Sequence, residues 1–449
     1  MWVIPGLWDC HTHFTQWAKT LGRLDLINAR SAAEAMDMLR RHLDERRAAD
    51  TLDPDAFVVG MRFRHSLWAD DEQPTLAAID AVTGEQPVAL SSADMHCGWV
   101  NSAAARRLGV HVDESGLVGE LEWFNAYTAF DKAPGAAEET DRLLREAEQD
   151  AASKGVVGIR DYEMAENIDT WINRFAAGIN GLRVDAGVYP ERLRAAIDAG
   201  WHTGKELPGS AGLGHVGAMK LISDGSRSAY CSTPYSGIEP LTYGTLSYTP
   251  QQIEDYMRLA TEHGFDIACH AIGDEANTIA LNAVAATHAH GSIEHAQMLK
   301  PVDIPRFAEL GLTASIQPQH AMDDRDVITR FWANPAGIPY PFRALHDAGT
   351  TLRMGSDAPV APLDPWLAIS AAVLGTESSD REPFQPEQCL DVHTSLAAST
   401  ATGRDRLASG DPADVVLLDA DPYAADTPEA MRAMPQHVVM TLLCGERTY

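Results

Sequence analysis

The chain has 449 residues, of which 45% are hydrophobic and 22% are charged, and this composition excludes a disordered, collagen-like or coiled-coil protein. The 64 Asp and Glu residues outnumber the 35 Lys and Arg residues and give a formal net charge of -29, so neither nucleic acid nor an anionic membrane is an expected partner. The length allows roughly three domains, or one α/β barrel with insertions.

The expected location is the cytoplasm. The six cysteines are scattered and form no CxxC pair, which is typical of a reduced intracellular protein. No apolar run reaches the roughly 18 residues that span a bilayer. At the amino terminus no basic stretch precedes an apolar one, so a secretory signal is not predicted.

In chain order, short apolar or β-branched strands alternate with longer helical patterns. This alternation predicts parallel βα units, and eight strands predict a closed (β/α)8 barrel of the α/β class. Ser31 and Glu34 form an expected capping box, while Thr249 and Pro250 begin a helix that ends at Gly264. The expected strands cover residues 2–9, 156–161, 183–189, 218–223, 265–270, 292–295, 312–317 and 351–356.

Two further parts are predicted besides the barrel. Residues 15–154 separate the first strand from the second and are too long for a loop, so we expect an inserted substrate-side subdomain there. The barrel then comprises residues 1–14 and 155–400. Residues 401–449 contain two short strand patterns and predict a small β unit.

His11 and His13 directly follow the first strand. In an extended backbone the side chains at i and i+2 point the same way, so these two imidazoles would face one side and could bind a metal. Alone, this pair is a weak signal. The same spacing recurs at His288 and His290, where a helix end predicts solvent-exposed histidines.

Three other predicted strands end in residues of the same chemical kind. His270, His295 and Asp357 stand at carboxyl ends of strands, where barrel enzymes gather their catalytic residues. Imidazole and carboxylate suit zinc or a similar divalent ion, and the lack of a cysteine ligand set favours a catalytic site over a structural one. The alternative is a set of core histidines, which would have to arise at each place independently.

Lys220 lies within an apolar strand pattern. A buried ammonium is costly, so this lysine is expected to be neutral, paired or modified. A neutral amine can add carbon dioxide to form a carbamate that bridges two metals. The alternative is a lysine at the strand end that pairs with Asp224, and the residues alone leave both open.

The chain contains, in order, the segments PGLWDCHTHF, MKLISDG, HAIGD, IEHAQ, QPQH and GSDAP, with DMHCGWVNSAA in the expected insertion. Together they resemble the metal-dependent amidohydrolase superfamily, specifically its YtcJ-like branch, which includes N-substituted formamide deformylases. The resemblance implies that His11, His13 and Asp357 bind one divalent metal, expected to be zinc. It also implies that His270 and His295 bind a second, and that carboxylated Lys220 bridges the two ions with a hydroxide.

The resemblance implies hydrolysis of an amide C–N bond in a small N-formyl or other N-acyl compound. Asp357 would take the proton from the hydroxide and pass it to the leaving nitrogen. One alternative is a deaminase that acts on an aminated ring with a mononuclear site. A less favoured alternative is a metal-binding protein without catalysis.

Four residues are candidates for substrate contact. His96 and His320 match branch positions expected to face the substrate, where an imidazole can donate to a carbonyl or oxyanion. Asn101 and Arg227 are weaker candidates, and Asn101 is alternatively the cap of the helix that follows it.

Other residues near the predicted ligands are expected to support them or to take no part. Asp274 is expected to orient His270. Strand alternation points Glu294 and Cys269 away from their ligating neighbours, so neither is assigned chemistry.

Two segments remain. Gly212–Gly217 matches GxGxxG but precedes the Lys220 strand, so it predicts a flexible entry loop instead of a dinucleotide site. Relatives usually carry several dozen residues of β-strand before the PG-x-x-D-x-H-x-H segment, so the small β unit is expected to lack its amino-terminal half. Its exposed strand edge would then be covered by a loop or by the second subunit of a homodimer.

Overall fold

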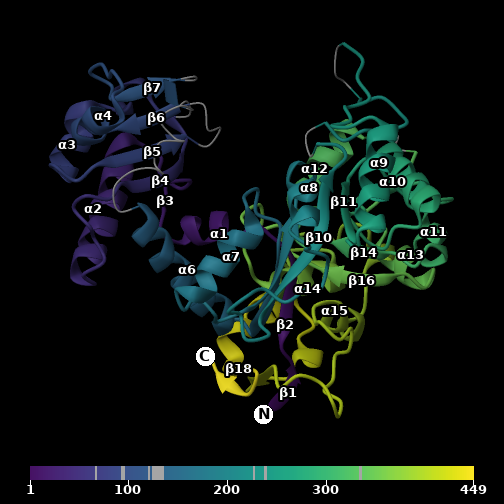
Figure 1. Cartoon of the computed structure of the whole chain (residues 1–449). Coiled ribbons are helices and arrows are strands. Elements are labelled where there is room, and N and C mark those ends of the chain that lie inside the picture. Colours follow the sequence, from purple (N-terminus) through teal and green to yellow (C-terminus); the bar gives the residue numbers. More distant parts are fainter. Residues whose placement is uncertain are drawn as a thin grey trace. The chain divides into compact units, whose positions relative to one another are not determined.

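The computed structural model describes residues 1–65, 68–92, 97–119, 122–123, 136–225, 228–236, 240–332 and 336–449. Its contacts divide the chain into two compact units. The barrel unit comprises Met1–Trp17 and Ala147–Tyr449, and the inserted unit comprises Ala18–Glu146. Figure 1 shows the elements of each unit along the chain.

Eight parallel strands form the main sheet of the barrel unit, in the order β16-β14-β12-β11-β10-β9-β8-β2. The two end strands are joined where the backbone N–H of Asp357, just after β16, donates to the carbonyl of His11 at 2.7 Å. The predicted barrel of the α/β class is therefore confirmed. The strands are β2 (Leu7–Thr12), β8 (Val156–Asp161), β9 (Arg183–Val188), β10 (Gly214–Ile222), β11 (Ile267–Ala271), β12 (Gly291–His295), β14 (Thr313–Ile316) and β16 (Thr351–Met354).

Helices follow most of these strands, as βα units require. Thr249 and Pro250 begin α9 as predicted, and the structure adds a capping box there, with both reciprocal hydrogen bonds between Thr249 and Gln252 present. No helix in the described part of the chain is both long and apolar enough to cross a membrane. The main helices of the barrel unit are α7 (Asn167–Ala176), α8 (Pro190–Asp198), α9 (Pro250–Glu262), α10 (Asp274–Thr287), α11 (Ile304–Glu309), α12 (Pro318–Phe331), α13 (Phe342–Asp347), α14 (Pro365–Leu374) and α15 (Val392–Ala398).

The predicted first strand, residues 2–9, is in fact two strands in two sheets. Trp2–Pro5 forms β1, which pairs antiparallel with β17 (Val415–Leu418), and β2 begins at Leu7. Pro5 has no N–H to donate, and a Cβ at Gly6 would lie 2.4 Å from a methyl group of Val157, so the chain changes sheet at this point. β1 thus supplies an amino-terminal strand to the small sheet, while the absence of the unit's amino-terminal half stays a prediction.

The small sheet has the order β1-β17-β18-β19, with β18 at Val438–Leu443 and β19 at Glu446–Arg447. Ile4, Leu7, Val416 and Leu418 are fully buried in one cluster with Trp366 of α14. The cluster contains residues of β1, β2 and α14, so it joins the small sheet to the barrel.

The prediction of a flexible entry loop at the GxGxxG segment is wrong, because β10 begins at Gly214 and includes Gly217. A Cβ at Gly217 would lie 3.0 Å from the carbonyl carbon of Ala186 on β9. This glycine therefore permits a close approach of two strands, and the segment after Gly214 is not an entry loop.

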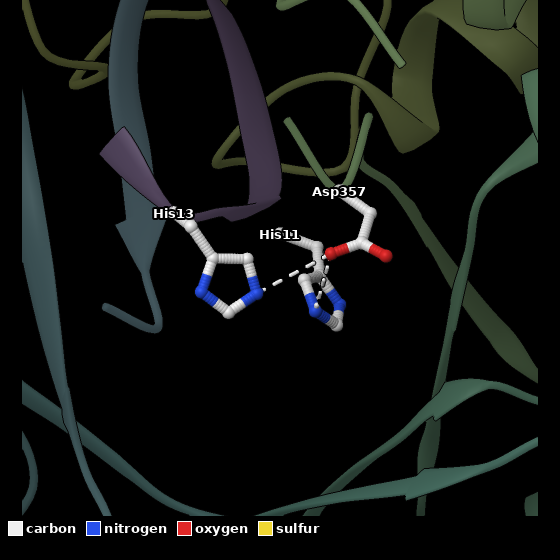
Figure 2. Close-up of side chains that lie close together, drawn as sticks. All are labelled: His11, His13 and Asp357. Carbon is white, nitrogen blue, oxygen red and sulfur yellow. Dashed lines mark ion pairs between the residues drawn. The ribbon is translucent and has the colours of Figure 1, made fainter. Parts of the chain in front are cut away.

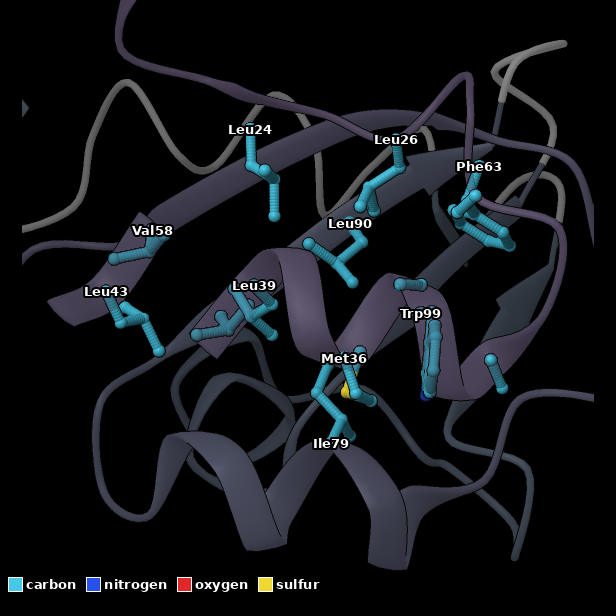
Figure 3. Close-up of a cluster of buried hydrophobic side chains, with 14 of the residues drawn as sticks. Leu24, Leu26, Met36, Leu39, Leu43, Val58, Phe63, Ile79, Leu90 and Trp99 are labelled. Atoms are coloured by element: carbon cyan, nitrogen blue, oxygen red, sulfur yellow. The ribbon is translucent and has the colours of Figure 1, made fainter. Parts of the chain in front are cut away.

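The inserted unit contains a five-stranded sheet of order β3-β4-β5-β6-β7. Its hydrophobic core, shown in Figure 3, places Trp99 and Phe63 of the sheet against Met36 and Leu39 of α2. Ser31 caps α2 as predicted, but the Glu34 carboxylate accepts from the N–H of Arg30 instead of Ser31. The elements are β3 (Leu24–Asp25), α2 (Ala32–Ala48), β4 (Val58–Phe63), α3 (Leu76–Thr83), β5 (Val88–Ser92), β6 (Cys97–Val100), α4 (Ser102–Leu108) and β7 (Leu117–Gly119).

Candidate metal centre

His11 and His13, at the carboxyl end of β2, both face the carboxylate of Asp357, which follows β16. The distances from His11 Nε2 and from His13 Nε2 to Asp357 Oδ1 are both 3.4 Å. Figure 2 shows the two rings approaching one carboxylate oxygen. One ligand atom from each residue lies within 4.8 Å of the others, which is close enough to hold a metal ion.

A second group with the same geometry contains His295, His320 and Asp357. His320, in the first turn of α12, has its Nε2 3.9 Å from Asp357 Oδ2. His270, which the resemblance implies as the partner of His295, lies beside it with 4.4 Å between ring centroids. Asp357 thus belongs to both groups, and His320, predicted to contact substrate, lies among the expected metal ligands.

Lys220, on β10, is buried among these residues. Its Nζ lies 2.6 Å from His11 Nε2 and 4.4 Å from the centre of the Tyr162 ring. Burial lowers the pKa of Lys220. Two nitrogens at 2.6 Å need a lone pair on one of them, which a neutral amine or imidazole supplies.

The suggested pairing of Lys220 with Asp224 is not found. The Asp224 carboxylate accepts hydrogen bonds from the backbone N–H groups of Tyr230, Ile272 and Gly273. Within the described residues, Lys220 forms no ion pair with a carboxylate. Its hydrogen-bond partner among the described residues is His11.

The ring nitrogens of this cluster suit a divalent metal. His13 Nδ1, His270 Nε2 and His295 Nδ1 are buried with no hydrogen-bond partner among the described residues. Burial and the neighbouring Lys220 lower the pKa of His270 to about 3, and burial with His270 lowers the pKa of His295 well below its ordinary value. The rings of His270 and His295 are therefore neutral, with lone pairs available to a cation, which is the state in which histidine binds metals.

Asp357 completes the cluster as an ionised carboxylate. Burial alone would raise its pKa, but His11 and His13 hold the pKa of this carboxyl well below its usual range. Its backbone has a φ of 58°, and that of His295 is 69°. Non-glycine residues rarely adopt this left-handed region, and such strain gathers at functional sites.

Glu294 is a residue of the site that sequence reasoning missed. Its Oε2 lies 2.6 Å from His11 Nδ1, and both side chains are buried. The Ser292 hydroxyl donates to the other carboxylate oxygen. Side chains do not alternate regularly at the end of β12, because the backbone of His295 is left-handed. Glu294 and His295 can therefore both face the interior.

Asp9 was also missed. Its carboxylate is buried and accepts from the backbone N–H of His11 at 3.2 Å and of Ser356 at 2.9 Å. Burial raises the pKa of Asp9 to about 7. Asp9 thus joins β2 to the segment that carries Asp357. The sequence signal that could have identified it is a carboxylate within the buried segment LWDCHT.

The remaining predicted residues fall into two classes. His96 and Arg227 lie outside the described residues. Asn101 caps α4: its oxygen accepts from Val88 and Ala104, and its amide donates to Thr83 and Gln86. We therefore assign it to the architecture of the inserted unit instead of to substrate contact.

The prediction that Asp274 orients His270 is also wrong. Asp274 stands in the first turn of α10, and its carboxylate accepts from the backbone N–H and the hydroxyl of Ser232, not from His270. The carboxylate next to His270 is Asp224, with Oδ1 3.6 Å from His270 Nε2.

Comparisons with known proteins show which family the chain resembles. A family model described as the amidohydrolase family matches residues 1–449. The chain is 27% identical to amidohydrolase YtcJ of Bacillus subtilis (strain 168), covering 94% of this chain and 85% of that protein. It is 25% identical to the N-substituted formamide deformylase of Arthrobacter pascens, covering 95% of this chain and 85% of that protein.

A solved structure of similar fold is an uncharacterised metal-dependent hydrolase from Pyrococcus horikoshii OT3. The TM-score is 0.77 at 23% sequence identity, and the match covers 97% of this chain and 88% of that chain. The likeness supports the fold alone.

Proposed function

The chain belongs to the amidohydrolase family, and we propose that it is a metal-dependent hydrolase that cleaves the amide C–N bond of a small N-formyl or N-acyl compound. The observation that carries the proposal is the buried cluster of imidazoles around one ionised carboxylate, Asp357. The similarity to a formamide deformylase supports the choice of substrate class.

Two groups of ligands would hold the metal. His11, His13 and Asp357 would bind one divalent ion, with zinc the expected metal. His295, His320 and Asp357 would bind a second, with His270 beside His295. A bound divalent ion supplies a Lewis acid that polarises the scissile carbonyl and acidifies water. Glu294 accepts the Nδ1 proton of His11, which leaves the lone pair on Nε2 for the metal.

Asp357 is the proposed general base and acid. As an ionised carboxylate it can accept a proton from the attacking water and then donate that proton to the nitrogen that leaves as an amine. Lys220, as a neutral amine, can add carbon dioxide and lose a proton to become a carbamate. That modification would bring a carboxylate to within reach of His11.

The test is Asp357→Asn, assayed with a panel of N-formyl and N-acyl amines. We expect turnover to fall by at least about 100-fold, the usual contribution of general acid–base catalysis, while the melting temperature stays near that of the unsubstituted protein. Removal of the metal by a chelator should abolish turnover, and zinc should restore it. Full activity of Asp357→Asn, or of the chelated protein, would contradict the proposal.

The metal content gives an independent measure. We expect about two ions per chain and an added mass of carbon dioxide on Lys220. One ion and an unmodified lysine would instead favour a mononuclear site, as in a deaminase.

A further inference from the structure

A cavity of about 410 Å³ lies within the barrel, on the side of the strand amino termini. Its lining comes from six neighbouring strands, β8, β9, β10, β11, β12 and β14. Barrel interiors are ordinarily filled by layers of bulky branched side chains. Here the lining includes Gly217 and Gly291 and several polar residues, and the space is large enough for a small ligand.

Three polar residues of this lining form one row across the sheet. Arg160 on β8 is in register with Asp185 on β9, and Asp185 is in register with His215 on β10. All three line the cavity. The sheet therefore presents a cation, an anion and an imidazole side by side.

The two charged groups of the row form only a loose ion pair with each other. Arg160 Nε is 3.7 Å from Asp185 Oδ2, which is longer than a hydrogen bond. Among the described residues, no other acceptor reaches the guanidinium and no donor reaches the carboxylate. About a third of each side chain is exposed, at 32% and 31%, although both stand within strands of the barrel. A loosely paired cation and anion that both line a cavity can each form a hydrogen bond with a ligand.

The cavity has an entrance. Asp266 and Gly311, which belong to its lining, are exposed to solvent. A ligand can therefore enter from the amino-terminal side of the barrel.

We propose that this cavity binds a small zwitterion of the α-amino acid class. The carboxylate of the ligand would form the two-pronged contact that a guanidinium favours, at Arg160, and its ammonium group would donate to Asp185. A ligand with one positive and one negative group on the same carbon atom complements the row without adding net charge.

The cavity ends beneath the metal centre without including any of its ligands. Tyr162 lines the cavity and carries Lys220 Nζ over its ring. Ser292 also lines the cavity, and its hydroxyl donates to Glu294, the partner of His11. A ligand in the cavity would thus contact residues that support His11 and Lys220.

The first experiment measures binding to the purified full chain. The twenty common amino acids are tested one at a time by thermal shift and by isothermal calorimetry. The amino acid that binds best is then compared with the carboxylic acid that lacks its amino group and with the amine that lacks its carboxylate. We expect the zwitterion to bind at least about tenfold more tightly than either, the effect of one charge-assisted hydrogen bond.

Substitutions locate the site. Asp185→Asn keeps the shape of the side chain and should weaken amino-acid binding by about tenfold or more, with little effect on the carboxylic acid that lacks the amino group. Arg160→Met should abolish binding of both compounds. His13→Gln, at the metal centre, should leave amino-acid binding unchanged, because none of the cavity-lining residues is a metal ligand.

Three results would overturn the proposal. The first is that no amino acid binds at millimolar concentration. The second is that the carboxylic acid binds as tightly as the amino acid, which would indicate a simple anion site. The third is that His13→Gln loses binding while a folded Asp185→Asn keeps it, which would place the ligand at the metal centre. None of these results depends on hydrolytic activity, so the proposal fails or stands independently of the proposed function.

Discussion

At the scale of single residues, the candidate centre depends on how one imidazole is held. His11 contacts Glu294 through Nδ1 and lies 2.6 Å from Lys220 and 3.4 Å from Asp357 through Nε2. Burial alone would raise the pKa of Glu294, yet His11 and Lys220 hold it at about 2. An ionised carboxylate on Nδ1 fixes the tautomer and the orientation of the ring.

Replacing Glu294 should therefore weaken metal binding more than it weakens the fold. For Glu294→Gln we expect zinc affinity to fall by about 10- to 100-fold, because the amide is a weaker acceptor for the Nδ1 proton. The affinity is measured by competition with a chromophoric chelator.

Glu275→Gln is the matched control, since Glu275 pairs with Lys300 and not with the cluster. This control should bind zinc as the unsubstituted protein does. Equal affinity in Glu294→Gln would show that His11 does not depend on this carboxylate.

At the scale of elements, helix caps determine where the barrel helices begin. Asp364 caps α14 by accepting from the backbone N–H of Trp366 at 3.0 Å. Burial raises its pKa from 3.8 to about 6, although Lys154 and the capped N–H groups oppose the shift. The hydrogen bond of the cap stabilises the start of α14. The buried negative charge of Asp364, however, lowers the free energy of unfolding at neutral pH.

The sign of the pH effect follows from this shift. Between pH 3.8 and about 6 the folded chain binds a proton at Asp364 that the unfolded chain has lost, so this contribution to stability decreases as pH rises through that window. Asp364→Asn keeps the cap and removes the charge. We expect it to be more stable than the unsubstituted protein by about 1–2 kcal/mol at pH 7.5, a value reduced for partial exposure, with no gain at pH 4.

Denaturant unfolding at both pH values measures this difference. Asp391→Asn is the control, because Asp391 caps α15 but its pKa is lowered instead of raised. A loss of stability in Asp364→Asn at pH 7.5 would contradict the argument.

At the scale of the whole molecule, segments far apart in sequence join the small sheet to the barrel unit. Ile4 of β1 is buried with Val416 of β17 and Trp366 of α14. The next strand, β2, carries His11 at its far end. Packing around β1 therefore anchors the start of the strand that carries the first predicted ligands.

Ile4→Ala should destabilise the barrel unit by about 2–4 kcal/mol, the usual cost of a cavity at a fully buried aliphatic site. Val3→Ala, the neighbouring position on the same strand, is the control, because Val3 is 51% exposed and should cost less than about 0.5 kcal/mol. Thermal unfolding of both variants is the measurement. Equal stability of the two would show that β1 contributes nothing to the core.

The sequence by itself determined the barrel and the positions of its histidines. The alternation of strands and helices is local, and parallel strands bring their carboxyl ends to one edge, so His11, His270, His295 and Asp357 could be expected together. Helix starts such as Thr249 were equally readable, because caps depend on residues a few positions apart.

Only the tertiary structure decided the contacts that depend on closure of the sheet. Glu294 reaches His11 from a strand 283 residues away, against the expectation from alternation, because a left-handed backbone at His295 changes which side chains face inward. Residues 2–5 form a strand separate from β2 because Pro5 and Gly6 interrupt the chain there. No hydrophobic pattern signals that this strand pairs with β17. The cavity beside Arg160 and Asp185 exists because small and polar residues of six strands meet inside one barrel, and spacing along the chain carries no record of that empty volume.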